Sequence, residues 1–247
     1  MPGPRISVDP HERVFILTGA GISAESGIRT FRDSGGFWEK YRFEEVASPE
    51  GWAADAALVW RFYSDRRAQA ATCRPNAAHV ALAELEAKLG DRLYLCTQNV
   101  DPLHEAGGSK RVVHMHGELM KSRCERSPEH CRSEPFADEA VYRTADAIAR
   151  CACGGRIRPH ICWFGEVPYA MDEIARELGR CDVFVTIGSS GAVYPAAGFV
   201  RAVSARRGTR TYYVGPEEPD NADAFDECVI GTATEVVPRL FSLPVSG

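Results

Sequence analysis

The segment that most constrains the fold is RVFILTGAGISAESG, residues 13–27, in which an apolar run leads directly into a glycine-rich stretch. A short, continuous apolar run is typical of a strand that is buried on both faces, as in a parallel sheet. Glycines directly after such a strand permit a tight turn, and a helix is expected to follow them. The segment therefore predicts a strand, a loop and a helix in succession.

The same alternation recurs along the chain. Asn76 can cap a helix over residues 77–89 that ends at Gly90, and residues 92–96 then form the next expected strand. Further strands are predicted over residues 111–115, 182–187, 209–214 and 228–230, with a helix from about residue 195 to residue 206. This alternation predicts an α/β fold, a doubly wound Rossmann-like parallel sheet with helices on both faces.

Two stretches do not follow the alternation. Residues 38–74 are aromatic and helical in pattern, and residues 118–161 are polar, contain four cysteines and have little apolar periodicity. We therefore predict a discontinuous Rossmann-like domain made of residues 1–37, 75–117 and 162–247. The helical insertion, residues 38–74, and the cysteine-bearing insertion, residues 118–161, are expected to form a smaller domain together.

Composition limits the partners of the chain. Its 247 residues are 45% hydrophobic, enough for a large core, and its net charge of -5 argues against a nucleic-acid partner, because such domains usually carry a basic face. No apolar run is long enough to span a membrane, and the first ten residues do not resemble a signal peptide. These features predict a cytoplasmic protein. Nine cysteines, of which four cluster between residues 124 and 153, favour a metal site over disulfides.

The segment Gly19-Ala20-Gly21-Ile22-Ser23 fits the pattern of a loop that binds the pyrophosphate of a dinucleotide. An ordinary strand-to-helix turn built from small residues is the alternative. A dehydrogenase would also have a second strand ending in an acidic residue about twenty residues later, to hold the adenosine ribose. Residues 26–45 have no such pattern. A dinucleotide is therefore expected to bind here without serving in hydride transfer.

Five segments, in the same order along the chain, resemble the sirtuin family of NAD-dependent protein lysine deacylases: residues 19–38, 97–101, 114–119, 158–166 and 188–199. The resemblance extends from about residue 13 to residue 240. It implies a Rossmann-like domain with a smaller helical and zinc-binding module, NAD consumed as a co-substrate, one structural zinc, and acyl-lysine proteins or peptides as substrates. The implied products are nicotinamide, O-acyl-ADP-ribose and free lysine.

The TQNVD segment, residues 97–101, follows an expected strand, at a position where open α/β sheets bind ligands. An ordinary turn rich in asparagine and aspartate is the alternative. By the resemblance, Gln98 and Asn99 would face the nicotinamide ribose, with Val100 beside them. Asp101 would accept hydrogen bonds from the nicotinamide carboxamide, as a carboxylate can.

His114 and His116 lie two residues apart on an expected strand, so their side chains share a face. His116 is nearer to the carboxyl end of the strand and matches the family's catalytic histidine. We therefore expect His116 to be the general base for a ribose hydroxyl and His114 to be structural.

The resemblance assigns further NAD contacts to Phe31, Arg32, Trp38, Gly188, Ser189, Ser190, Gly215, Pro216, Glu217 and Ala233. The chain departs from the family at residues 215–217, where many relatives carry an asparagine for the adenosine ribose. An extended substrate peptide would pair with the main chain near Phe164, Gly165, Glu166 and Val193. An ordinary loop is the alternative for these residues.

Tyr63 and Arg66 are candidates for recognising the acyl group, because they share a helix face at i, i+3. A phenol hydroxyl and a guanidinium can clamp a carboxylate together, and the pattern resembles the sirtuin subgroup that removes succinyl, malonyl or glutaryl groups. Arg67 lies on the same face, so spacing alone does not choose the arginine. The alternative is a solvated arginine face with Asp65 as an internal partner.

The four clustered cysteines, Cys124, Cys131, Cys151 and Cys153, depart in spacing from the two C-x-x-C pairs common in sirtuins. Four thiolates can still close a tetrahedral zinc site with no position open for water, which would make the metal structural. His130, His160 and Cys162 are alternative ligands, and a metal-free module of reduced cysteines is a further alternative.

Two other classes of function use the same features. An ADP-ribosyltransferase or NAD hydrolase would cleave NAD without forming O-acyl-ADP-ribose, and a non-catalytic NAD-sensing module would bind NAD without turnover. A base at His116 and an acyl clamp at Tyr63 and Arg66 favour the deacylase.

Overall fold

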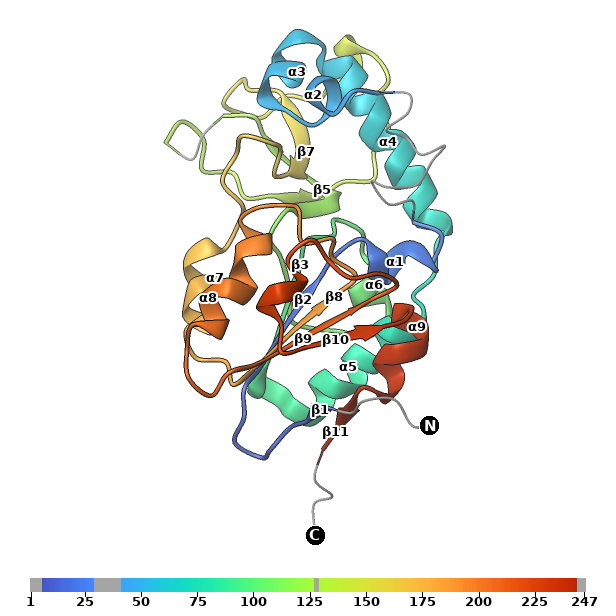
Figure 1. Ribbon diagram of the computed structural model, residues 1–247. Helices are drawn as coiled ribbons and strands as arrows, with labels where there is room; N and C mark the ends of the chain where they lie inside the picture. The colour runs from blue at the N-terminus through green and yellow to red at the C-terminus, as the bar shows by residue number, and fades with distance from the viewer. Residues whose placement is uncertain (1–5, 29–40, 127–128, 244–247) are drawn as a thin grey trace.

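The structure is a computed structural model that describes residues 6–28, 41–126 and 129–243. Figure 1 shows a larger part that contains a parallel sheet and a smaller part above it. Six parallel strands form the larger sheet in the order β10-β9-β8-β2-β3-β4. They are β2 (Val14–Thr18), β3 (Leu93–Thr97), β4 (Val112–His114), β8 (Val183–Ile187), β9 (Arg210–Gly215) and β10 (Glu227–Ile230). All six strand predictions are confirmed, with ends that differ by one residue.

Alternate side chains of β2 belong to two separate cores. Val14 and Ile16 pack with α5 (Ala77–Leu89) and α9 (Ala233–Val236), and Phe15 and Leu17 pack with α7 (Met171–Leu178) and α8 (Phe199–Ser204). Figure 1 shows these helix pairs on opposite faces of the sheet. Both faces of β2 are therefore covered, which explains its uninterrupted apolar sequence and confirms the doubly wound fold.

The strand order reverses beside β2. From β2 the chain first builds β3 and β4 on one side, and later adds β8, β9 and β10 on the other side. In open parallel sheets such a reversal leaves a crevice at the carboxyl ends of the central strands, where ligands bind. The residues that follow β2, β3 and β8 are those that the sequence assigned to NAD.

The smaller part joins three helices to a three-stranded antiparallel sheet of order β6-β5-β7. The helices are α2 (Phe43–Val46), α3 (Pro49–Ala54) and α4 (Ala56–Thr72), and the strands are β5 (Gly117–Cys124), β6 (Phe136–Ala137) and β7 (Ile157–Ile161). Both insertions contribute to one buried cluster, in which Trp60 and Phe62 pack with Ile157. The prediction that they lie together agrees with this cluster, whereas the domain boundaries stay a prediction.

Several short elements were not predicted. The helix after the first glycines, α1 (Gly21–Ala24), has only four residues, and the helix expected near residues 195–206 is divided into a 3-10 turn, Ala196–Gly198, and α8. Other elements outside the prediction are α6 (Leu103–Ala106), α7 and the parallel pair of β1 (Ile6–Ser7) with β11 (Phe241–Ser242). Short 3-10 turns lie at Gly90–Arg92, Ala145–Ala147, Ala222–Ala224 and Val237–Arg239. Among the described residues, no helix combines the length and apolar character that crossing a membrane requires.

Candidate functional site

The glycine loop after β2 packs backbone against backbone on the loop after β8. The Gly21 N–H donates to Gly188 O at 2.8 Å, and the Gly19 N–H donates to Ile187 O at 2.9 Å. A Cβ placed on Gly19 or on Gly21 would lie 2.8 Å from Gly188 O, and Gly188 itself has a φ of +65°. These glycines are therefore required by the contact between the two loops, in addition to any approach to a phosphate.

The TQNVD segment continues this junction from β3. The Gln98 N–H donates to Thr18 O at 2.9 Å, and the Gln98 side-chain amide donates to Ser189 Oγ at 3.0 Å. Residues that follow β2, β3 and β8 are therefore joined by hydrogen bonds at one edge of the sheet. This is the ligand-binding edge that the strand order predicts.

Asn99 and Asp101, which also follow β3 at this edge of the sheet, are buried and only 7% and 4% exposed. The Asn99 side-chain amide donates to Ser23 Oγ at 3.2 Å, and the Asn99 N–H donates to Thr97 Oγ1 at 3.0 Å. Asp101 accepts a hydrogen bond from the Leu103 N–H at 3.1 Å, and burial raises its pKa. Ser23, Asn99 and Asp101, predicted from two separate motifs, thus form one buried polar group.

A second layer of buried polar residues lies behind this group and was missed from the sequence. Thr18 Oγ1 donates to Thr97 Oγ1 at 2.8 Å and lies 2.9 Å from His104 Nε2. His79 Nε2 lies 3.4 Å from Ser23 Oγ, and burial lowers the pKa of His79 to about 4 and of His104 to about 3. Both rings are neutral supports for the polar group. No spacing in the sequence distinguishes them from ordinary helical residues.

His114 and His116 have different hydrogen bonds. In His116, Nδ1 lies 3.0 Å from Gln98 O, and because a carbonyl can only accept, Nδ1 carries the proton and Nε2 has the lone pair. In His114, Nδ1 lies 2.9 Å from Asn99 O and Nε2 lies 2.8 Å from a Glu105 carboxylate oxygen, so both nitrogens are donors. His116 is therefore arranged as a neutral base, and His114 as a cation.

The pKa shifts follow from these contacts. Burial lowers the pKa of His116, and the hydrogen bond to Gln98 opposes this only in part. Burial also disfavours the charged form of His114, but the hydrogen bond and charge of Glu105 outweigh burial and raise its pKa above the usual histidine value. Near neutral pH, His116 is the histidine of this pair that can accept a proton.

Arg66 and Arg67, which are adjacent on α4, have different contacts. Arg67 is 4% exposed and pairs with Asp138 at 3.6 Å. Its guanidinium also donates to Leu119 O, Ala140 O, Lys121 O and Ser122 Oγ at 2.8, 3.1, 3.2 and 3.1 Å. Arg66 packs over the Phe62 ring, and within the described chain no hydrogen bond to its guanidinium is found. Arg66 is therefore the arginine that remains available for a ligand beside Tyr63.

Arg66 lies near both Tyr63 and Asp101. Burial lowers the pKa of Arg66, and its electrostatic interactions with these two residues oppose that effect. The predicted acyl clamp is thus adjacent to the polar group assigned to nicotinamide.

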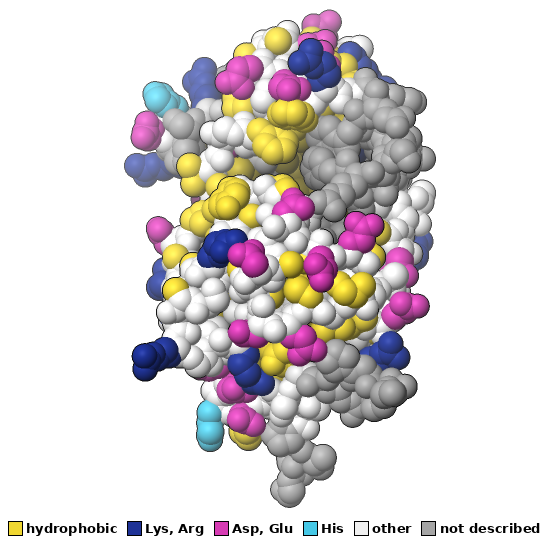
Figure 2. Space-filling view, viewed as in Figure 1, with side chains coloured by type: hydrophobic (Ala, Val, Ile, Leu, Met, Phe, Trp, Pro, Cys, Tyr) yellow, Lys and Arg dark blue, Asp and Glu magenta, His cyan; other side chains and the backbone are white. Residues whose placement is uncertain are grey.

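The loop after β7 carries the residues predicted to meet a substrate peptide. Phe164 is 47% exposed and stacks edge-on against Phe43 with ring centroids 5.1 Å apart. Val193 and Tyr194 are also exposed, and Figure 2 shows apolar side chains along the junction of the two parts.

Not every predicted peptide contact in this loop is open. The Phe164 N–H already donates to Ala47 O at 3.0 Å, and the Glu166 N–H donates to Trp163 O at 3.0 Å. The Glu166 carboxylate is held by Arg158 at 2.7 and 2.9 Å. A main-chain pairing by Phe164 or Glu166 is therefore limited to their carbonyl groups, while Gly165 has no backbone hydrogen bond within the described residues.

The adenosine end of the predicted site is less complete. Pro216 and Glu217 are exposed after β9, and a Cβ on Gly215 would collide with the Tyr213 hydroxyl. Ala233 is 4% exposed and belongs to the core that also contains Val14 and Ile16 of β2. Ala233 therefore offers little surface to an adenine. The NAD contacts predicted for Phe31, Arg32 and Trp38 lie outside the described residues.

The four predicted metal ligands come together in the smaller part. The Sγ atoms of Cys124, Cys131, Cys151 and Cys153 lie within 4.8 Å of one another, with Cys124–Cys153 and Cys131–Cys151 at 3.5 Å. Sulfur ligands of a tetrahedral zinc lie about 3.8 Å apart. Loops of unequal length thus bring the ligands together despite their unusual spacing. The four thiolates fit one structural zinc.

The alternative ligands lie elsewhere. Cys162 Sγ contacts the carbonyl groups of Trp163 and Glu166, and His160 stacks on the Tyr169 ring at 4.6 Å. Over residues 6–28, 41–126 and 129–243, the four cysteines are the only such cluster found, with no histidine in it. The loop that follows Cys153 packs closely on the cluster, because a Cβ on Gly155 would lie 2.8 Å from Cys124 Sγ. This close packing is consistent with a closed site.

Replacing Cys124 by serine is expected to reduce bound zinc from about one ion per chain to nearly none and to lower Tm by about 10 °C or more. Cys124 is 4% exposed at the end of β5, so its loss affects both the ligand set and the small sheet. Elemental analysis and thermal unfolding measure the two effects. Cys162→Ser is the matched control and should retain the metal. Wild-type protein purified without chelator and free of zinc would contradict the assignment.

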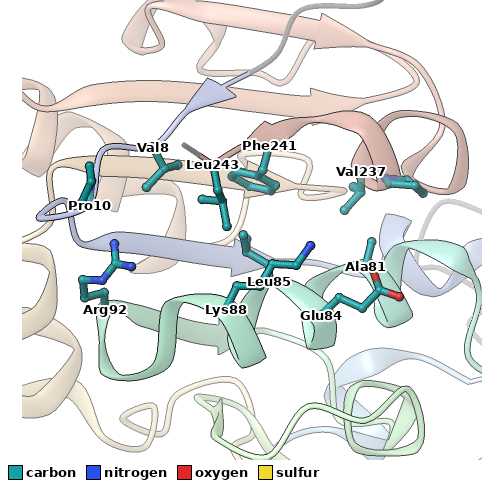
Figure 3. A pocket seen from close by; sticks show the side chains of 11 residues that line it. Val8, Pro10, Ala81, Glu84, Leu85, Lys88, Arg92, Val237, Phe241 and Leu243 are labelled. Carbon is teal, nitrogen blue, oxygen red and sulfur yellow. The ribbon is translucent and has the colours of Figure 1, made fainter. Parts of the chain in front are cut away.

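A cavity of about 570 Å³ lies away from these residues, at the end of the larger part near β1 and β11. Figure 3 shows it between α5 and the segments that carry Val8 and Phe241. None of the residues predicted for NAD, acyl group, peptide or zinc lines it.

Comparison with known proteins agrees with this geometry. Residues 19–195 match the model of the Sir2 family. A Caulobacter vibrioides protein named NAD-dependent protein deacylase is 53% identical, over 92% of this chain and 94% of its own length. A crystal structure of a Sir2 homologue in complex with NAD has a TM-score of 0.81 and 38% identity, over 93% of this chain and 88% of that chain.

A further structure holds a Sir2 protein with a deacetylated p53 peptide and 3′-O-acetyl ADP-ribose, at a TM-score of 0.78 and 30% identity over 92% of this chain and 91% of that chain. The family model covers well over half of the chain, and the identity to the Caulobacter protein extends over nearly all of it. The resemblance noted in the sequence is thereby confirmed, and this chain belongs to the Sir2 family.

Proposed function

We infer that this chain is an NAD-dependent protein lysine deacylase. The observation that carries the inference is His116, whose Nδ1 is held by Gln98 O so that Nε2 is the basic nitrogen, beside the buried group of Ser23, Asn99 and Asp101. The names of close relatives support the same activity. They favour it over the ADP-ribosyltransferase, the NAD hydrolase and the non-catalytic module.

The proposed reaction consumes NAD. The acyl oxygen of a modified lysine attacks C1′ of the nicotinamide ribose as nicotinamide leaves, with Asp101 accepting from the carboxamide and Asn99 oriented toward the ribose. His116 Nε2 then accepts a proton from a ribose hydroxyl, and the ribose oxygen attacks the imidate carbon. Water completes the transfer and gives O-acyl-ADP-ribose and free lysine. Zinc takes no part in these steps, because its four thiolates would leave no open position.

We propose acyl-lysine peptides and proteins as substrates, with acetyl and also succinyl or malonyl groups removed. The support for an acidic acyl group is the pair of Tyr63 and Arg66, since Arg67 is fully engaged with the protein. The structure with a deacetylated peptide supports a peptide substrate in this family.

The test incubates the protein with NAD and peptides that differ only in carrying acetyl-lysine or succinyl-lysine, and identifies the products by mass. O-acetyl-ADP-ribose and O-succinyl-ADP-ribose with equivalent free lysine are expected. ADP-ribose formed without loss of the acyl group would indicate an NAD hydrolase. ADP-ribose attached to a protein would indicate a transferase.

We expect the acid limb of the kcat/KM profile to have an apparent pKa below 6.5, the ordinary histidine value. Burial lowers the pKa of His116, and the base acts when neutral. Activity is therefore complete above that lowered pKa and is lost as the pH falls through it. Initial rates between about pH 4.5 and 8 measure the limb.

Glu105→Gln is the control for this profile. It removes the carboxylate that raises the pKa of His114 and does not contact His116. The acid limb should stay in place in this variant. A limb that moves with Glu105→Gln would identify His114 as the titrating group and would contradict the assignment of His116.

A further inference from the structure

The hydroxyl of Tyr63 has a partner that the sequence does not indicate. The indole Nε1–H of Trp163, a residue 100 positions later in the chain, donates to the Tyr63 oxygen at 3.0 Å, and the two side chains are 2% and 3% exposed. An indole N–H can only donate, so the Tyr63 oxygen must be the acceptor. The hydroxyl proton of Tyr63 is therefore not used in this bond and can be donated to another group.

No acceptor for that proton is found in the part of the chain that the structure describes. Of the charged groups around Tyr63, Arg66 has the largest electrostatic effect on it, and a guanidinium has no acceptor atom. Burial raises the pKa of Tyr63 to about 12, so the hydroxyl keeps its proton near neutral pH. A buried O–H beside a cation is a suitable binding group for an anionic oxygen.

The direction of the indole is fixed from its other side. The Arg158 guanidinium lies 3.2 Å from the centroid of the Trp163 ring and is itself held by two hydrogen bonds to the Glu166 carboxylate. The same carboxylate accepts a hydrogen bond from the backbone N–H of Trp163 at 2.8 Å. The indole therefore has little freedom to turn away from Tyr63.

We propose that Trp163 is a positioning residue for acyl selectivity: by donating to the Tyr63 oxygen, it directs the Tyr63 proton to the terminal carboxylate of an acidic acyl chain, which Arg66 binds at the same time. The proposal rests on the removal of acidic acyl groups proposed above. An acetyl group has no carboxylate at its end. The contribution of Trp163 is therefore confined to acidic acyl chains.

The test is Trp163→Phe, which keeps an aromatic ring over Arg158 and removes the N–H. We expect kcat/KM for a succinyl-lysine peptide to fall about tenfold, with kcat/KM for the matched acetyl-lysine peptide within about twofold of wild type. Trp52→Phe is the matched control. Trp52 packs against Trp163 with ring centroids 5.9 Å apart and donates to Glu125, so this variant loses a comparable bond without touching Tyr63.

A double-mutant cycle with Tyr63→Phe shows whether Trp163 acts through Tyr63. The double variant should lose no more desuccinylation than Tyr63→Phe alone, because the phenol oxygen is the only atom that transmits the effect. Independent, additive losses would overturn the proposal. Equal losses of deacetylation and desuccinylation in Trp163→Phe would do the same.

A further measurement does not depend on the folding of Trp163→Phe. In the wild-type protein, hydrogen exchange at the Trp163 indole N–H, followed by NMR, should stay slow when a succinyl-lysine peptide binds, because the Tyr63 oxygen remains its acceptor. Tyr63→Phe should make that exchange faster. Exchange that accelerates on binding of the succinyl peptide would show that the bond breaks, contrary to the proposal.

The outcomes separate this proposal from the one on which it rests. Wild-type protein that removes acetyl but never succinyl groups would refute the acidic-acyl function and the role of Trp163 together. Wild-type desuccinylation that is lost in Tyr63→Phe and retained in Trp163→Phe would refute the role of Trp163 alone.

Discussion

Replacing His116 by alanine is expected to lower kcat for deacylation by between about 10² and 10⁴-fold, the usual contribution of a general base. The change removes the nitrogen with a lone pair at the edge of the TQNVD segment, and among the described residues it removes one side-chain hydrogen bond, to Gln98 O. Stability should therefore change little. Initial rates with product identification by mass, together with Tm, measure the two quantities.

The order of the proposed steps makes the test sharper. Nicotinamide leaves before His116 accepts a proton, so exchange of labelled nicotinamide into NAD should be affected less than the formation of O-acyl-ADP-ribose. His114→Gln is the matched control, since His114 holds Asn99 O and Glu105. It should lower Tm and retain most of kcat. A His116→Ala variant with near wild-type kcat would show that another group is the base.

Replacing Arg66 by methionine is expected to lower kcat/KM for a succinyl-lysine peptide by about 100-fold or more, with deacetylation within about threefold of wild type. Methionine keeps the apolar contact with Phe62 and removes the charge that would meet the acyl carboxylate. The measurement is the ratio of the two kcat/KM values, with peptides of identical sequence.

Arg61→Met is the control for Arg66→Met. Arg61 lies on the same helix and pairs with Asp55 at 3.8 Å, and both side chains are partly exposed. Its loss should leave the selectivity ratio unchanged. Equal loss of desuccinylation and deacetylation in Arg66→Met would show that Arg66 supports the site in general, for instance through Asp101, and would contradict its role in acyl recognition.

The larger sheet was predictable because its central strands, β2 and β8, are buried on both faces. Five consecutive buried residues in β2 and in β8 produce apolar runs that stand out in the sequence. The helix after Asn76 was predictable for a different reason. The Asn76 side chain accepts from the Ala78 N–H, and Gly90 ends the helix at a φ of +56°. Both signals are local, so no knowledge of the fold is needed to read them.

The small sheet was not predictable in the same way. The alternation of buried and half-buried residues in β5 is interrupted, with a register shift between Gly117 and Ser122 against β7. Residues 136–137 form a strand of only two residues, both exposed. The missed helix α7 has only Ile174 and Leu178 buried among eight residues. These elements are defined by their neighbours, and their own sequences carry little of that information.

The motifs predicted which residues lie together at the site, but not the contacts that position them there. Gly19 and Gly21 were interpreted through a phosphate, whereas the structure also uses them for contact with Gly188. The choice between Arg66 and Arg67 depended on carbonyl groups of β5, more than fifty residues away. Such partners follow only from the packing of α4 on the small sheet.

The hydrogen bond between Trp163 and Tyr63 also has an evolutionary consequence. One partner is on α4 and the other follows β7, so a lineage that acquires or keeps this bond needs suitable side chains at two positions 100 residues apart. Among homologues, a tyrosine at position 63 should occur together with a side chain at position 163 that can donate a hydrogen bond. Lineages that have lost the tyrosine should vary freely at position 163.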